Sequence, residues 1–292
     1  MNNLELNSTI DLKREGKSFY WASFFLPKKS RENAGILYSI CRYFDDIADK
    51  NNEDKTTYLE GTIKEIKNNK SNKVNIFLQK NNIHQSIFID LIEGLITDQR
   101  NTKIQNKDEL IKYSYHVAGT VGLMMSKIIG VKHDMGARSA IDLGIGMQLT
   151  NIARDVYEDA KIKRIYLPAN WITNISLNDL RATHALSLEQ DEKIANAIHE
   201  IINLSEQFYK NGFAGLKYIP LSTRLAIFIA ANVYRGIGIK IKKNKKYIRK
   251  RVYLTLLDKT LITMNSILFF VFLPLFNFQY KKIRNSLPNE NL

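Results

Sequence analysis

The chain has 292 residues, of which 45% are apolar, with 14 glycines and only 5 prolines, and it carries a formal net charge of +14. This length can bury a sizeable core, and the scarcity of glycine and proline favours long helices over a turn-rich β architecture. The single cysteine, Cys41, excludes an internal disulfide and a cysteine-built zinc site. The charge leaves nucleic acid, an anionic membrane or an anionic substrate open as partners, although lysine is abundant throughout the chain.

Helical periodicity dominates the chain, and strand signals are nearly absent. The first 17 residues contain no apolar run of signal-peptide length, and residues 1–11 are expected to form a flexible N-terminus. We predict loops at 70–73, 130–134 and 161–176. The predicted helices are 31–50, 55–68, 83–98, 107–129, 137–160, 188–216, 220–243 and 253–272. The sequence therefore predicts an all-α fold, with a single domain over residues 12–272 around a central cavity.

The predicted helix over 31–50 carries an acidic cluster within otherwise apolar sequence. Its charged residues follow one another at i, i+3, i+4 and i+7, which places them along one face of a helix. They are Arg42, Asp45, Asp46 and Asp49. Carboxylates in an apolar environment are costly unless a cation meets them, so this face requires positive charge from elsewhere.

A second cluster of the same kind lies on the predicted helix over 137–160. Its polar residues again share one stripe, and Arg154 and Glu158 stand beside them. The stripe consists of Gln148, Asn151, Asp155 and Asp159. One such cluster could be a solvated helix face with this spacing by chance. Two clusters, each with an arginine nearby, are much more specific.

Two facing carboxylate pairs are a natural site for Mg²⁺. Two like charges 4 Å apart repel by roughly 4 kcal/mol at an effective dielectric constant of about 20, so protons or metal ions must balance them. Mg²⁺ is usually held by a few carboxylates together with the phosphates of a substrate. Arg42 and Arg154 are suited to bind the same phosphates. The two clusters therefore predict diphosphate chemistry.

Gly119 and Gly122 lie within the predicted helix over 107–129. They are not followed by the Lys-Ser/Thr pair of a phosphate-binding P-loop. Two interpretations remain open. The glycines make room for a long apolar substrate, or they allow close helix packing.

The C-terminal third contains a basic run at 240–251 and an uncharged stretch at 260–280. The basic run is a solvated face or a membrane-facing patch, and it lacks any motif for nucleic-acid recognition. The uncharged stretch nearly has the length of a membrane span, but polar residues interrupt it. We favour a last core helix with an apolar tail over a helix that spans the membrane. A monotopic anchor, which enters only one face of the membrane, is the intermediate interpretation. Residues 273–292 are expected to form an apolar and then basic tail that can contact a membrane.

Several stretches resemble the squalene and phytoene synthase family of head-to-head prenyl transferases. Residues 41–49 resemble the first aspartate-rich motif of this family, and residues 148–159 resemble the second. Supporting matches are residues 17–19, 113, 117–122, 164–168 and 233–238. Residues 166–171 and 234–240 are most similar to bacterial phytoene synthases. The chain departs from the family at Gly16, where serine is frequent, and at Lys163, where glycine is frequent.

The resemblance implies an isoprenoid-synthase-type helical bundle. It implies condensation of two geranylgeranyl diphosphates to phytoene through a cyclopropyl (prephytoene) diphosphate, with Mg²⁺ as the metal, Mn²⁺ as its alternative, and without NADPH. The alternative is a C15 enzyme that makes squalene, presqualene diphosphate or dehydrosqualene. A head-to-tail elongation enzyme and a non-catalytic assembly protein are further options, but both aspartate pairs are intact. The corresponding expectation is a cytoplasmic enzyme at the inner face of the cell membrane. Such an enzyme hands phytoene to a desaturase and binds no nucleic acid.

The resemblance also implies roles for individual residues. Asp45, Asp49, Asp155 and Asp159 would bind metal, and Tyr113 would act in catalysis. The implied substrate-binding residues are Lys17, Ser18, Phe19, Arg42, Gln148, Asn151, Arg154, Tyr234 and Arg251. Aromatic side chains can stabilise carbocations through their π faces, or they can simply pack in the core. The candidates for such a wall are Phe19, Tyr38, Tyr113 and Phe228.

Overall fold

The computed structural model describes residues 13–14, 16–49, 55–99, 103–181, 186–243, 251–273, 276 and 278–290. The expected flexible N-terminus at 1–11 and residues 244–250 of the basic run lie outside these described residues. All regular elements within the described part of the chain are helices, which confirms the predicted all-α class.

The long helices agree with the prediction to within a few residues at most ends. The elements are α2 (Lys17–Ser23), α3 (Lys28–Asp49), α4 (Lys55–Lys67), α5 (Lys73–Lys80), α6 (Gln85–Gln99), α7 (Lys107–Ser114), η1 (Tyr115–Gly119), α8 (Thr120–Ile128), α9 (Asp134–Lys161), α10 (Leu177–Arg181), α11 (Leu188–Ala214), η2 (Leu216–Tyr218), α12 (Leu221–Lys243) and α13 (Leu256–Phe272).

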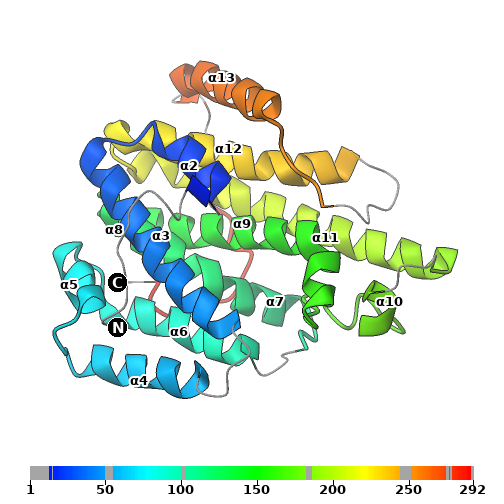
Figure 1. The fold of residues 1–292 in the computed structure, drawn as a ribbon. Coiled ribbons are helices and arrows are strands. Elements are labelled where there is room, and N and C mark those ends of the chain that lie inside the picture. The colour runs from blue at the N-terminus through cyan, green and yellow to red at the C-terminus, as the bar shows by residue number, and fades with distance from the viewer. Residues whose placement is uncertain are drawn as a thin grey trace.

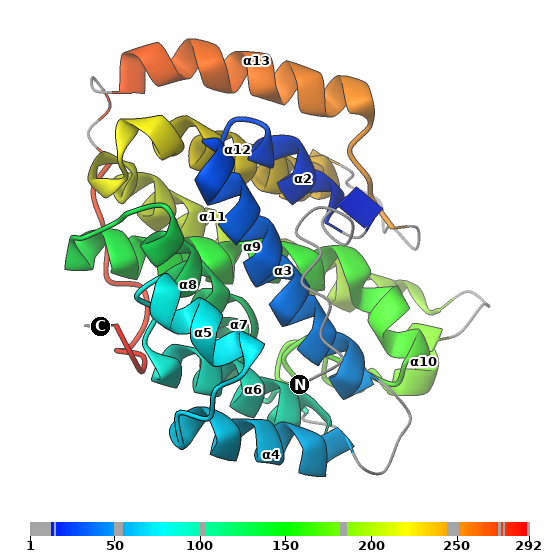
Figure 2. The same cartoon turned by 60° about the vertical axis from the view of Figure 1, so that its left-hand side comes forward.

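Helix α9 forms the centre of the bundle. It packs against α8, η1, α11 and α12, while α2 and α13 both lie against α12. In Figures 1 and 2, α13 lies at one edge of the molecule over α12, and α4 lies at the opposite edge. One central helix therefore touches most of the others, and residues along α9 can face a common interior.

Local sequence explains where several helices begin. The Asn72 side chain accepts a hydrogen bond from the backbone N–H of Asn75 at the start of α5, which the prediction had left without a helix. Ser187 and Gln190 form a capping box at the start of α11, and Thr255 and Asp258 form another at the start of α13.

The predicted helix over 107–129 is interrupted by a π-helical turn, η1. Beyond it, Gly122 brings α8 into direct backbone contact with α9. A Cβ atom at Gly122 would lie 2.2 Å from the carbonyl oxygen of Ala140, and a Cβ at Gly144 would lie 2.3 Å from that of Ala118. No side chain fits at either place, so the structure supports the close-packing interpretation of Gly122.

Helix α13 is not the core helix that the sequence analysis favoured. Its only buried residues are polar: Thr263 accepts a hydrogen bond from the indole N–H of Trp21, and Ser266 bonds within the helix. Ile262 and Phe270 pack against the protein, but most of the apolar side chains of α13 project outward. They form the outer face of α13, which consists of Leu257, Leu261, Met264, Leu268, Phe269, Val271 and Phe272. That expectation was wrong because Thr263 and Ser266, with Ile262 and Phe270, face the protein, whereas the leucines lie on the exposed side.

Within the described part of the chain, no helix has the length and apolar character that a membrane crossing requires. After α13 the chain returns to the bundle. Arg284 forms a buried ion pair with Asp142 of α9 at 2.6 Å, and Asn289 donates to Asp90 of α6. The sequence-based boundary at residue 272 therefore leaves out a segment that packs on the body of the protein.

Candidate active site

A cavity of about 1030 Å³ lies within the bundle, between α2, α3, α8, α9 and α12. This agrees with the expected central cavity. All the side chains that the sequence analysis assigned to a site line this one cavity. They are Lys17, Ser18, Phe19, Arg42, Asp45, Asp49, Tyr113, Gln148, Asn151, Arg154, Asp155, Asp159, Tyr234 and Arg251. The structure thus brings these residues together, while the role of each stays a prediction.

The acid end of the cavity is defined by Asp45, Asp49, Asp155 and Asp159. On α3, Arg42 forms ion pairs with Asp45 at 3.0 Å and with Asp46 at 2.6 Å. These contacts follow from the i, i+3 and i, i+4 spacing of the sequence. The first acidic motif therefore carries its own counter-charge on the same helix.

Two arginines hold Asp155 on α9. Arg154 donates to both carboxylate oxygens, at 2.8 Å and 2.5 Å, and Arg251 donates to the same two oxygens at 2.7 Å and 3.1 Å. Such two-pronged contacts fix the plane of the carboxylate. Arg251 comes from the segment before α13, so this contact links the end of the chain to the second acidic motif.

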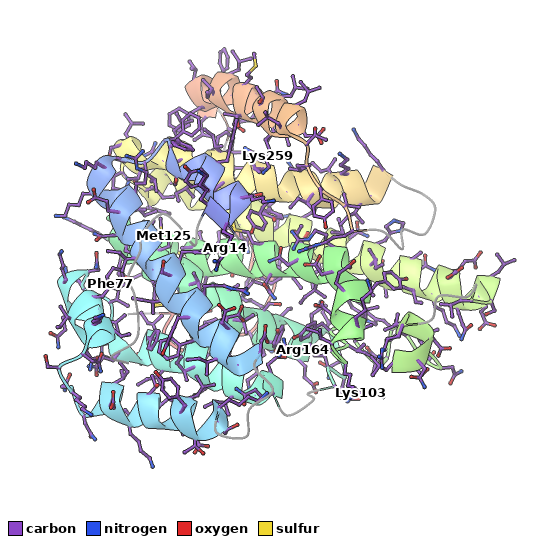
Figure 3. All side chains as sticks on the ribbon, in the orientation of Figure 1. Arg14, Phe77, Lys103, Met125, Arg164 and Lys259 are labelled. Carbon is purple, nitrogen blue, oxygen red and sulfur yellow. The ribbon has the colours of Figure 1, made fainter. Side chains whose placement is uncertain are left out.

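The sequence analysis assigned no role to Arg164, yet it lies between the two motifs. It pairs with Asp49 at 2.7 Å and with Asp98 at 3.5 Å, near the C-terminal end of α3, where Figure 3 labels it. Its charge also lowers the pKa values of Asp45 and Asp159, against the effect of their burial. The family resemblance of residues 164–168 includes Arg164, so this arginine could have been predicted from the sequence. No motif or spacing in the sequence indicates Asp98.

Asp98 also orders the aromatic residues beside the acid end. It accepts hydrogen bonds from the hydroxyl of Tyr166 at 2.9 Å and 3.0 Å, and the Tyr166 ring stacks on Tyr113 with 4.8 Å between centroids. Tyr113, which the resemblance marked as catalytic, is therefore held in place by a residue that the sequence analysis missed.

The acid end remains short of positive charge despite its arginines. Burial, and then the neighbouring Asp49 carboxylate, raise the pKa of Asp45 to about 6. Burial and the Asp155 carboxylate raise the pKa of Asp159 to about 7. Carboxylates that resist ionisation in this way would be stabilised as anions by an additional cation.

Asn151 supplies a further observation that fits a metal ion. Its side-chain oxygen is buried and has no hydrogen-bond partner among the described residues, while its amide nitrogen donates to Gln148 at 3.3 Å. Within the described ranges, no three Asp, Glu, His or Cys side chains are grouped closely enough to hold a metal by themselves. Hard oxygen donors that leave coordination positions open suit Mg²⁺, which typically completes its shell with water and substrate phosphates.

The cavity continues away from the acid end along α9. Gly136 and Asp155 both line it, and they are about 28 Å apart at the usual helical rise of about 1.5 Å per residue. Apolar side chains such as Val121, Met125 and Leu143 cover this part of the wall, and Figure 3 labels Met125. A long hydrocarbon chain therefore fits beside a charged head at the acid end.

Three of the four expected aromatic wall residues line the cavity. Phe19 lies 4.7 Å from Tyr234 and 6.5 Å from Tyr38, measured between ring centroids. Phe228 does not line it, and that expectation was wrong. Its ring packs between Phe213 and Phe270 on a different side of α12, which is the core-packing alternative.

Comparisons with known proteins agree with this geometry. A model of the squalene/phytoene synthase family matches residues 12–258. The chain is 31% identical to a 15-cis-phytoene synthase of Pantoea ananas over 268 residues, which cover 83% of this chain and 84% of the relative. It is 32% identical to a 15-cis-phytoene synthase of Enterobacter agglomerans, covering 77% and 81% of the two chains.

Solved structures show the same architecture. A dehydrosqualene synthase in complex with a ligand superposes with a TM-score of 0.79 at 25% identity, covering 90% of this chain and 95% of the other. A squalene synthase from Alicyclobacillus acidocaldarius has a TM-score of 0.69 at 20% identity, covering 81% and 90%, and this likeness concerns the fold alone.

Proposed function

The chain belongs to the squalene/phytoene synthase family, and from this premise we propose that it is a phytoene synthase, which joins two geranylgeranyl diphosphates head to head. The observation that carries the proposal is one cavity whose lining runs about 28 Å along α9, from an apolar end at Gly136 to the acid end at Asp155. A prenyl chain of 20 carbons measures roughly 20 Å when extended, so it fits within this length when its diphosphate lies at the acid end.

Members of the family use a divalent metal ion, and for this chain we propose Mg²⁺. Asp45, Asp49, Asp155 and Asp159 would hold it, and the unpaired oxygen of Asn151 is a further donor. When bound, the metal neutralises the charge that develops on the departing diphosphate, which favours the transition state over the ground state.

The residues of the chain bind the substrate and protect the cation. Arg42, Arg154 and Arg251 bind diphosphate oxygens, and the apolar wall excludes water from the carbocations. The rings of Phe19, Tyr38 and Tyr113 present π faces to the cationic carbon.

The reaction balances without a reductant. The allylic C–O bond of the first substrate breaks and diphosphate leaves. The double bond of the second substrate attacks the cation, and loss of a proton closes a cyclopropyl diphosphate. That intermediate loses its own diphosphate, rearranges and loses a second proton to form phytoene. Two diphosphates and two protons are released, and the central double bond forms without a hydride, so NADPH is not required.

Product analysis tests the proposal. Purified protein is incubated with Mg²⁺ and either geranylgeranyl or farnesyl diphosphate, and we expect phytoene from the C20 substrate. Asp45→Asn and Asp155→Asn should each reduce turnover by at least about a hundredfold, because a metal ligand contributes several kcal/mol to the barrier. Asp108→Asn, on the surface at the start of α7, is the matched control and should keep normal turnover. Consumption of the C15 substrate alone would favour the dehydrosqualene-type alternative, and normal turnover of both active-site variants would refute the mechanism.

We also propose that α13 contacts an anionic membrane. Its outer face exposes apolar side chains, with Leu268 at 63% and Val271 at 73% exposure. The last turn of α12 carries Lys240, Lys242 and Lys243, and the ion pair of Lys240 with Asp258 places this basic turn at the start of α13. An apolar face flanked by lysines suits the headgroup region of an anionic bilayer. From that position phytoene could pass to a membrane-bound desaturase.

Vesicle co-sedimentation tests this contact. We expect binding to vesicles that contain phosphatidylglycerol and little binding to neutral phosphatidylcholine vesicles. Leu268→Asp should abolish binding, whereas Leu188→Asp, at a residue that is even more exposed but lies at the start of α11, should leave it unchanged. Equal partitioning of these two variants would show that α13 is not the contact.

A further inference from the structure

The positively charged residues that line the cavity, apart from Arg14, fall into two groups. The arginines of the acid end each hold a carboxylate: Arg42 holds Asp45, Arg154 and Arg251 hold Asp155, and Arg164 holds Asp49. Two lysines on the same cavity wall do not. The side chains of Lys17 at the start of α2 and of Lys259 on α13 have no hydrogen bond or ion pair to any other described residue, and we refer to them as the lysine pair.

Lys259 lies on the side of α13 that faces the protein, and it lines the cavity. Thr263, one turn further along α13, bonds to Trp21 of α2, so this side of α13 faces α2. Figure 3 labels Lys259 between α13 and the helices beneath it. The side chain is partly buried, and the lining segment from Arg251 to Leu254 connects it to the acid end. A lysine that served only to keep the protein soluble would point into water from the exposed side of α13, and Lys259 does not lie on that side.

The members of the lysine pair act on each other. Burial, and then the charge of Lys17, lower the pKa of the Lys259 ammonium. Two cations held on one wall repel each other unless an anion lies between them. No carboxylate of the described chain pairs with them, so the geometry leaves a place for an anion that comes from outside the protein.

We propose that Lys259, together with Lys17, binds the diphosphate group of a prenyl diphosphate, so that α13 supplies a substrate-binding residue of the active site. This inference rests on the proposed function for the identity of the anion. An ammonium group is a compact charge with three rotatable donors, and it can follow a diphosphate without fixing its orientation. Arg154 and Arg251 also bind the diphosphate in the proposed function, but their two-pronged contacts with Asp155 fix the direction of their remaining donors.

Calorimetry with inorganic diphosphate in the presence of Mg²⁺, together with steady-state kinetics, tests the proposal. Lys259→Gln should weaken diphosphate binding and raise KM for geranylgeranyl diphosphate by about tenfold, because a hydrogen bond to a charged group is lost. The value of kcat should change much less, because Lys259 would stabilise the bound substrate and the transition state equally. Lys259→Arg should restore most of the affinity, which a merely structural defect of α13 would not allow.

Lys80→Gln is the matched control, because it removes one positive charge from the exposed end of α5, away from the cavity. We expect wild-type binding and kinetics from this variant. If Lys259→Gln binds diphosphate and substrate as the wild type does, the inference is wrong and the proposed function stands. If the wild type consumes no prenyl diphosphate, the proposed function fails. The calorimetric comparison of wild type with Lys259→Gln then still decides whether Lys259 belongs to an anion site.

Discussion

At the scale of single residues, the backbone conformation of Lys163 determines how the chain turns from α9 toward the acid end. Its φ of 65° lies in the left-handed region, which glycine adopts without steric cost. The backbone N–H of Arg164 bonds to the carbonyl of Asp159, and that of Lys163 to the carbonyl of Ala160, which together close the end of α9. This turn directs Arg164 back toward Asp49. Glycine is frequent at position 163 in the family. With Lys163 in its place, the chain keeps the same turn but is less stable.

Replacing Lys163 by glycine should stabilise the protein. The left-handed conformation costs a lysine about 1–2 kcal/mol, and the greater freedom of glycine in the unfolded chain offsets about 0.5–1 kcal/mol of the gain. We expect a rise in melting temperature of about 2 °C by calorimetry. Lys161→Gly, at the last residue of α9, is the control and should lower the melting temperature. A fall for Lys163→Gly as well would contradict this account.

Residue-level prediction succeeded where helical periodicity alone places side chains. Arg42 and the acidic residues of α3 meet because they share one helix face, and the sequence contains all the information needed for that. The contacts of Arg164 with Asp98, and of Tyr166 with Asp98, join residues far apart in the sequence. They depend on how α6 packs against the segment after α9, which no local pattern encodes. The position of Lys259 escaped prediction for the same reason.

At the scale of elements, the long helices were predictable because their apolar periodicity extends over several turns. Short elements such as α2 and α5 were not, since an isolated helix of this length is marginal and tertiary packing stabilises it. The end of α13 was predicted well, but its exposed position was not. A uniformly apolar helix gives no periodic signal that distinguishes an inner from an outer face.

The contact between α8 and α9 gives a test at this scale. Gly122→Ala would place a methyl group against the carbonyl oxygen of Ala140, so the helices must separate. We expect a loss of about 1–3 kcal/mol in the free energy of unfolding, measured with denaturant, and reduced turnover because both helices line the cavity. Gly61→Ala in α4 meets no neighbouring atom within 4 Å and should stabilise by about 0.5–1 kcal/mol. Equal effects of the two substitutions would show that the helix contact is not tight.

At the scale of the whole molecule, the segment 278–290 ties the end of the chain to the central helix. The side chains of Arg284 and Asp142 are 4% and 0% exposed, Arg284 also pairs with Glu290, and Asn211 of α11 accepts from the backbone of Lys281. A C-terminal truncation that removes α13 would also remove Arg284 and leave Asp142 as a buried charge without its arginine. For this reason point substitutions on the outer face of α13 test membrane contact better than a truncation does.

Arg284→Met should destabilise the protein by about 3–5 kcal/mol, because it leaves the buried carboxylate of Asp142 unpaired. The double variant with Asp142→Asn should recover part of that loss, since residue 142 then carries no charge, while Glu290 lacks Arg284 in both variants. Denaturant unfolding of the wild type, both single variants and the double variant measures the coupling between the two residues. Additive losses would indicate that they do not stabilise the fold as a pair.

The route of the chain after α13 decides where the protein can be labelled. Glu290 lies beside Arg284 against the middle of the bundle, whereas α2 lies directly beneath α13 through the bond of Trp21 to Thr263. Figures 1 and 2 agree that the C-terminal end and α13 occupy different sides of the molecule. A fluorophore or affinity handle placed near Glu290 would leave α13 free to meet vesicles when the protein is attached to a sensor surface. The same handle next to α2 would obstruct both α13 and the wall that carries Lys17.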